Sequence, residues 1–266
     1  MKKHLLLLMG YCFITFSISA QETKVYLGIG GLYNSFQDTR VSDVQFNKVS
    51  GFPELGFSRV SAKDYGYAQV YGYLFNTNHP QYDSVEILTV GYNVRLGYLR
   101  KIYPNLYLGG TWDVVDYTSR DNELLGNNSN FYRMASDIFI SAKYLYRLNE
   151  SWDFDFGLDY GVLSFVNSAP SFTANFPQKT VDSGEVSFQE GEVRDPLSLK
   201  LMVAKPFWEQ FYLRTHIKVN FKKRFGLDYS WCMRTYADHK DYPITDAMHR
   251  LTFMFNFVSH QKSIQP

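Results

Sequence analysis

Beyond its first twenty residues the sequence has no long hydrophobic run. A transmembrane helix needs about 18 consecutive apolar residues, and no later stretch of the 266-residue chain approaches that length. The sequence therefore excludes a helical membrane bundle. It also has little net charge, with 27 basic and 26 acidic residues, and so lacks the basic face that nucleic-acid binding requires.

Cysteine is scarce as well, with only Cys12 and Cys232 in the chain. The first lies in an N-terminal segment that has lysines at 2–3, an apolar stretch at 5–16 and small residues ending at Ala20. That order predicts a secretory signal peptide that is cleaved after Ala20. The mature chain then has a single cysteine, which excludes an internal disulfide framework.

Aromatic residues are abundant, since 21 Tyr, 22 Phe and 4 Trp make up 18 % of the chain. Such a composition excludes intrinsic disorder. The clearest pattern runs over residues 152–162, where large apolar side chains alternate strictly with Asp or Gly. Period-two alternation predicts a β-strand, and an apolar face that ends in Trp and Tyr is typical of a strand in contact with lipid.

Five further segments alternate in the same way, namely 88–98, 137–148, 197–203, 211–221 and 250–257. Short turns are expected at 62–64, 103–105, 149–151 and 206–210, and they alternate with longer polar stretches at 37–50, 76–84, 119–132, 167–194 and 225–247. Short turns on one side and long loops on the other are typical of outer-membrane barrels. The sequence therefore predicts an all-β, antiparallel up-and-down transmembrane barrel of ten strands, with both termini on the short-turn side.

Two segments leave alternatives open. In residues 65–75, either the tyrosines face lipid together with Gln69, or Ala68, Val70 and Leu74 face lipid and the tyrosines fill the lumen. Residues 225–236 also alternate, and we interpret them as an extension of the preceding strand beyond the membrane. A separate crossing there would raise the count to twelve strands.

The polar faces of the strands place charged residues in the predicted lumen. They are Arg95, Lys143, Arg147, Asp153, Asp155, Asp159, Arg214, His216 and Lys218. Side chains fill the interior of a barrel of about ten strands, and buried charges are paired. We therefore interpret these residues as a salt-bridged plug with a structural role. The functional alternative is a narrow polar path or a ligand pocket.

The longest loop, residues 167–194, is the strongest candidate for binding, because loops beyond about 15 residues are often functional. It carries Phe172, Phe176 and Phe188. These side chains either bind a partner or pack inward over the barrel mouth as part of a lid.

Catalytic candidates are weaker. Acids, bases and one serine are found at the predicted rim and in the loops, namely Asp113, Asp116, Ser183, Asp238, His239, Asp241, Asp246 and His249. None matches a barrel-enzyme motif, so no catalytic residue is predicted. The His and Asp spacings fit no zinc site, and the Asp/Gly-rich pattern of a calcium loop is missing. The sequence predicts neither a metal nor a cofactor.

The leader that ends at Ala20, the opening strand at 25–33 and the aromatic final strand at 251–257 together resemble the small outer-membrane β-barrel proteins of the Bacteroidota. The resemblance is one of architecture, without a subfamily signature. It implies residence in the outer membrane, contact with its lipid, and insertion by the barrel-assembly machinery guided by the last strand. We expect a signal peptide at 1–20, a barrel at 21–258 and a polar C-terminal tail at 259–266.

We therefore expect a non-enzymatic outer-membrane protein with a structural, interaction or ligand-binding role, which engages an envelope protein partner or a small ligand. The alternatives are an outer-membrane hydrolase of lipid or peptide and a narrow solute channel. A wide diffusion pore would need about sixteen strands. If Asp238, His239 and the rim aspartates converge around an open cleft, the hydrolase gains support.

Overall fold

The computed structural model describes residues 22–39, 44–79, 82–121, 131–168, 202–237 and 243–259. All the secondary-structure elements in these ranges are β-strands. Over the same residues, no helix is long and apolar enough to cross a membrane.

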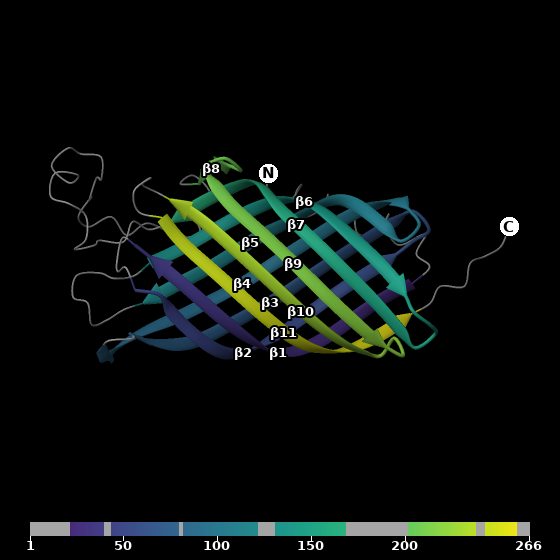
Figure 1. Ribbon diagram of the computed structural model, residues 1–266, viewed down its shortest axis with the longest axis horizontal. Helices are drawn as coiled ribbons and strands as arrows, with labels where there is room; N and C mark the ends of the chain where they lie inside the picture. The colour runs from purple at the N-terminus through teal and green to yellow at the C-terminus, as the bar shows by residue number, and fades with distance from the viewer. Residues whose placement is uncertain are drawn as a thin grey trace, which may run out of the picture.

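Eleven strands are described in chain order. They are β1 (Glu22–Asp38), β2 (Phe46–Val60), β3 (Asp64–His79), β4 (Tyr82–Tyr103), β5 (Leu106–Asp121), β6 (Phe131–Arg147), β7 (Trp152–Ser168), β8 (Val203–Pro206), β9 (Gln210–Phe221), β10 (Phe225–Ala237) and β11 (Pro243–Ser259). Neighbours in sequence pair antiparallel, except that β8 and β9 both pair with β7, and the pairing of β1 with β11 closes the sheet into a barrel of tilted strands (Figure 1).

The short β8 and the longer β9 form one wall of this barrel. β8 pairs with residues 163–166 of β7, and β9 continues along the same neighbour from Leu213, opposite Tyr160. Between them, the Phe207 amide donates a hydrogen bond of 3.1 Å to the Val162 carbonyl. Because β8 and β9 share one position in the ring, the eleven described strands occupy ten strand positions, which we call walls. This number agrees with the ten strands that the alternation predicts.

The turn predicted at residues 206–210 is wrong, and so is the interpretation of residues 225–236 as an extension. The first error adds one strand to the predicted count and the second removes one, so the total of ten is unchanged. Residues 206–210 interrupt the β8–β9 wall rather than joining two crossings, and residues 225–237 form the separate strand β10 rather than an extension of β9. The true turn lies at Lys222 and Lys223, with φ of 48° and 59°, and the Arg224 amide bonds the Phe221 carbonyl across it at 3.2 Å. Such two-residue turns usually carry Asn-Gly, so a pair of lysines gives no turn signal.

The two ends of the barrel differ in their connections. The short turns at 61–63, 104–105, 148–151 and 222–224 lie at the same end as the first and last described residues. At the opposite end the strands run further than predicted. β3 continues to His79 and β4 begins at Tyr82, so most of the expected loop at 76–84 is strand.

The barrel is polar inside and apolar outside. On the exterior, Ile29 is 73 % exposed, Ile140 63 % and Leu74 62 %, whereas inside Arg214 is 2 % exposed and Asp113 is fully buried. A band of exposed apolar side chains on a closed barrel is stable only in lipid, where every backbone hydrogen bond is made within the sheet. The fold is therefore a transmembrane β-barrel.

The open question over residues 65–75 is also answered. Tyr65, Tyr71 and Tyr73 are buried in the lumen, whereas Val70 and Leu74 face outward. Most of the inner face of this strand is therefore aromatic.

Lumen-facing glycines make room for these rings. A Cβ built on Gly97 lies 1.9 Å from the Tyr67 ring, and one on Gly91 lies 2.2 Å from the Tyr73 ring. Each glycine is the cross-strand partner of the tyrosine that covers it. Packing an aromatic ring over a cross-strand glycine also pins the register of a twisted sheet.

Replacing Gly97 with Ala is expected to lower the free energy of unfolding by about 1–3 kcal/mol, because the Tyr67 ring must move out of a packed lumen. Gly72→Ala is the matched control, since its Cβ meets only ordinary contacts, the nearest at 3.5 Å. Urea unfolding of the refolded protein in lipid vesicles measures both. Equal stability of the two variants would contradict this packing.

Candidate functional site

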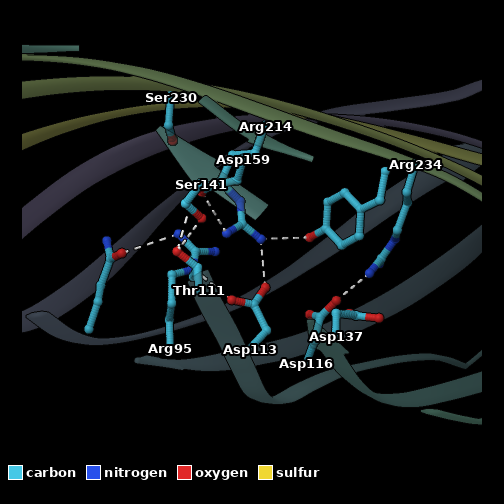
Figure 2. A network of polar contacts seen from close by, with 12 residues as sticks. Arg95, Thr111, Asp113, Asp116, Asp137, Ser141, Asp159, Arg214, Ser230 and Arg234 are labelled. Carbon is cyan, nitrogen blue, oxygen red and sulfur yellow. Dashed lines mark hydrogen bonds and ion pairs between the residues drawn. The ribbon is translucent and has the colours of Figure 1, made fainter. Parts of the chain in front are cut away.

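The central charged cluster joins residues of four strands, β4, β5, β7 and β9, around Asp113 on β5. Arg95 Nε donates to Asp113 Oδ1 at 2.7 Å, and Arg214 Nη2 donates to Oδ2 at 2.6 Å. Arg214 also contacts Asp159 at 3.4 Å and donates to the Tyr212 hydroxyl at 3.0 Å. Figure 2 shows the Arg214 guanidinium reaching Asp113. We call Arg95, Asp113, Asp159 and Arg214 the central cluster.

A second network, the outer cluster, lies nearer the long-loop end. It consists of Asn34, Asp116, Arg120, Arg133, Asp137, Arg234 and Asp246. Asp246 accepts from Arg120 and Arg234, each at 3.0 Å, and from Asn34 at 2.7 Å. Asp116 accepts from Arg133 at 3.0 Å and also pairs with Arg234.

The outer cluster spans the full width of the lumen. Arg120 is on β5 and Asp246 is on β11, which are five strands apart in either direction around the ten-walled ring. Arg234 on β10 binds Asp116 on β5, four strands away. These contacts cross the lumen instead of following its wall. We call the central and outer clusters together the septum.

A third group, the inner cluster, lies on the short-turn side. Lys143 donates to Asp155 Oδ2 at 3.0 Å, and His216 Nε2 lies 3.4 Å from Oδ1 of the same carboxylate and 3.1 Å from Lys143 Nζ. Gly157 is the cross-strand partner of His216. The His216 ring can lie over this position because glycine has no side chain, whereas a Cβ there would lie only 1.9 Å from the imidazole.

Aromatic rings and arginines pack together in the rest of the lumen. The Arg250 guanidinium lies 4.0 Å from the Tyr71 ring centroid, and that of Arg120 lies 3.8 Å from Phe36. Such cation–π contacts are stronger when desolvated. On the short-turn side, Glu54 accepts from the Tyr26 hydroxyl at 2.9 Å and pairs with Arg250 at 3.7 Å.

Of the nine charged residues predicted for the lumen, seven lie inside it and two lie at its mouth. Arg95, Lys143, Asp155, Asp159, Arg214 and His216 meet in the central and inner clusters, and Lys218 lies beside the Tyr26 ring. Arg147 and Asp153 instead pair with each other at 2.9 Å at the short-turn mouth, where the Arg147 side chain is 63 % exposed.

Several residues of the outer cluster were not predicted as lumen charges. Arg120 falls in the stretch 119–132 expected to be a loop, Arg133 follows directly after it, and Arg234 falls in the segment interpreted as an extension. Asp116, expected at the rim, is buried in the cluster. Continuing the alternation of 88–98 and 137–148 into the neighbouring segments is the signal that locates them.

Among the described catalytic candidates, Asp116 and Asp246 meet only through Arg234 in the outer cluster, and Asp113 lies in the central cluster. Asp246 points into the lumen, whereas His249 faces outward and its Nδ1 lies 2.8 Å from the Tyr229 hydroxyl. Asp238, His239 and Asp241 lie outside the described residues, as do Ser183, Phe172, Phe176 and Phe188. Among the described residues, no group of three or more His, Cys, Asp or Glu side chains could hold a metal ion.

A scan against protein-family models finds no match, and a search of curated proteins also finds none. Among solved structures, the chain is similar to the toluene transporter TodX of P. putida, with 8 % identity, a TM-score of 0.33, and coverage of 93 % of this chain and 92 % of that one. It is similar to the translocator domain of the autotransporter NalP from Neisseria meningitidis (10 %, TM-score 0.39, 96 % of each chain). It is also similar to the β domain of the Bordetella autotransporter BrkA (7 %, TM-score 0.41, 87 % and 98 %).

The class of this protein follows from its own strand pairing and its inside-out polarity. It is a closed transmembrane β-barrel in which ion pairs cross the lumen.

Asp113→Ala is expected to lower the free energy of unfolding by about 3–5 kcal/mol, because it leaves two buried arginines without their shared carboxylate. Asp153→Ala removes an aspartate from a solvent-exposed ion pair and is expected to cost less than about 1 kcal/mol. Urea titration of both variants in vesicles measures the difference. Equal losses would show that the buried pairs contribute no more than a surface pair.

Proposed function

We propose that this chain is a non-conducting outer-membrane barrel with a structural or interaction role, in which the extracellular loops carry the contacts to a partner. The observation that carries the proposal is the septum, above all the Arg120–Asp246 pair that bridges opposite walls at 3.0 Å. A solute that entered the lumen would have to break buried ion pairs, and each broken pair costs about 3–5 kcal/mol.

The outer membrane is the compartment that fits this fold. Bacterial outer membranes contain closed antiparallel barrels with short turns on one side, and the short turns here lie beside both described ends of the chain. We propose export by the N-terminal leader with cleavage after Ala20, and insertion by the barrel-assembly machinery. The final strand supports insertion, since Phe253, Phe255 and Phe257 face outward together.

An interaction role is favoured over catalysis by the placement of the described acids and bases. Asp113, Asp116 and Asp246 are each held by two arginines. A general base needs free access to the proton that it removes, and these carboxylates are buried and shared. Contacts made by the long-loop side are therefore the remaining route to a partner.

The septum predicts that the refolded wild-type barrel gives no steady conductance steps in a planar bilayer. The charge-neutral variant Asp113→Ala/Arg214→Ala/Arg234→Ala/Asp246→Ala removes one acid and one arginine from each cluster. It thereby breaks the Asp113–Arg214, Asp116–Arg234 and Arg120–Asp246 pairs that cross the lumen, and it is expected to conduct. Steady single-channel steps from the wild type would overturn the proposal, whether or not the variant folds.

A matched control is the double variant Arg147→Ala/Asp153→Ala, which removes the same residue types outside the septum. It is expected to stay silent like the wild type. Heat-modifiable gel mobility checks that each protein is a folded barrel before its conductance is recorded.

The loop contribution is tested by replacing residues 169–194 with a short Gly/Ser linker. The variant is expected to reach the outer membrane and to lose the envelope proteins that chemical cross-linking joins to the wild type in cells. Replacement of residues 122–130 by a linker provides the comparison. If the cross-linked proteins are the same in all three, the longest loop is not the contact site.

A further inference from the structure

The lumen on the short-turn side of the septum contains a vestibule of about 440 Å³. It extends from Asn105 and Lys223 at the turns inward to Asp155 and Lys218. A smaller cavity of about 40 Å³ shares Lys218 with it and reaches Arg95 and Arg214 of the central cluster. The vestibule is therefore a blind pocket that faces the periplasm in the proposed orientation. Its volume is within the range of about 300–1,000 Å³ that small-molecule sites occupy.

One side of the vestibule is apolar and aromatic. Tyr65 and Tyr107 on β3 and β5 pack edge to face, with ring centroids 6.0 Å apart, and Val60 and Leu145 pack against the same cluster. All four residues line the vestibule. This side can bury the body of a small apolar ligand.

The other side carries lysines. Lys24 on β1, Lys218 on β9 and Lys223 in the β9–β10 turn line the vestibule there. In the ring of walls, β9, β10, β11 and β1 are consecutive and lie across the lumen from β3 to β6. A cationic side thus faces an apolar side.

The lysines outnumber the carboxylates that pair with them. Glu22 is shared by Lys24 at 2.8 Å and Lys223 at 3.4 Å. Lys218 forms no ion pair with any described carboxylate, and its ammonium lies 4.4 Å from the Tyr26 ring centroid. Asp155 is already held by Lys143 and His216 in the inner cluster.

One carboxylate does lie directly opposite Lys218. Asp228 is its cross-strand partner on β10, yet the two side chains form no ion pair, and Asp228 Oδ1 is buried without a hydrogen bond. Asp228 lines the smaller cavity and not the vestibule. Lys218 itself lines both spaces.

We propose that the vestibule binds a small organic anion, a carboxylate attached to an apolar body. Lys218 donates to the carboxylate, Lys24 and Lys223 raise the local positive potential, and Tyr65, Tyr107 and Leu145 cover the body. Charge-assisted hydrogen bonds between ammonium and carboxylate are among the stronger polar contacts. This site is independent of the extracellular loops and opens on the other side of the membrane.

The probe is 3-phenylpropionate, with the uncharged 3-phenylpropanamide as its isosteric comparison. Isothermal titration calorimetry of the full chain in lipid nanodiscs, with empty nanodiscs subtracted, is expected to give at least about tenfold tighter binding of the acid than of the amide. Raising the salt concentration is expected to weaken binding of the acid and leave that of the amide unchanged, because only the acid has a charge to screen.

Lys218→Gln is expected to bring the affinity for the acid to within about twofold of that for the amide, because the ammonium partner is lost. Lys63→Gln is the control, since Lys63 is exposed in the β2–β3 turn at the same end and does not line the vestibule. It is expected to bind like the wild type. Equal binding of acid and amide by the wild type, or no binding of either, overturns the proposal without reference to a variant.

Discussion

The structure depends on the pairing of charges inside a ring that is too narrow for bulk water. Lipid contact requires the outer faces of the strands to be apolar, so the polar half of each strand must point inward. A ten-walled barrel leaves little free bore, and a buried charge is tolerated only when it is paired. Asp113 meets that constraint with two arginines from β4 and β9. Because the partners come from different walls, each pair also fixes walls relative to one another.

The same constraint explains why glycine and tyrosine recur on the inner faces. Arginines and tyrosines are long, and a ring of fixed circumference has room for them only where other positions carry almost no side chain. Tyr67 lies over Gly97, and Tyr26 lies over Gly56. His216 reaches the inner cluster over Gly157 by the same geometry. The inner faces therefore alternate large and small residues across strands, while the outer faces, where lipid adapts to any shape, do not need to.

Alternation in the sequence predicted the fold class, the ten walls and most of the inward charges, because a side chain's face depends only on its parity along the strand. The partner that each charge meets was not predictable in this way. Arg120 and Asp246 are 126 residues apart, and their meeting depends on the stagger of every intervening strand. The turn at Lys222 and Lys223 gave no signal because it lacks Asn or Gly. Pro206 gave a false one, since a proline that interrupts a strand resembles a turn in sequence.

The ion pairs that close the outer part of the lumen use aspartates, and this affects which charged side chains lack a partner at the short-turn end. Carboxylates are used up toward the septum, where Asp113, Asp116 and Asp246 each serve two arginines. Toward the short turns, the cations that line the vestibule (Lys24, Arg147, Lys218 and Lys223) outnumber its carboxylates (Glu22, Asp153 and Asp155). Lys218 lies between these regions, where Asp155 is shared by Lys143 and His216 and where Asp228 forms no ion pair with it. A cation beside an open pocket can remain hydrated when the pocket is empty, so it does not incur the full cost of burial, and it gains a partner when an anion enters. The septum and the vestibule therefore result from one distribution of charge along the lumen. Ion pairing is complete in the septum, where water is excluded, and incomplete in the vestibule, where the lumen is open to water.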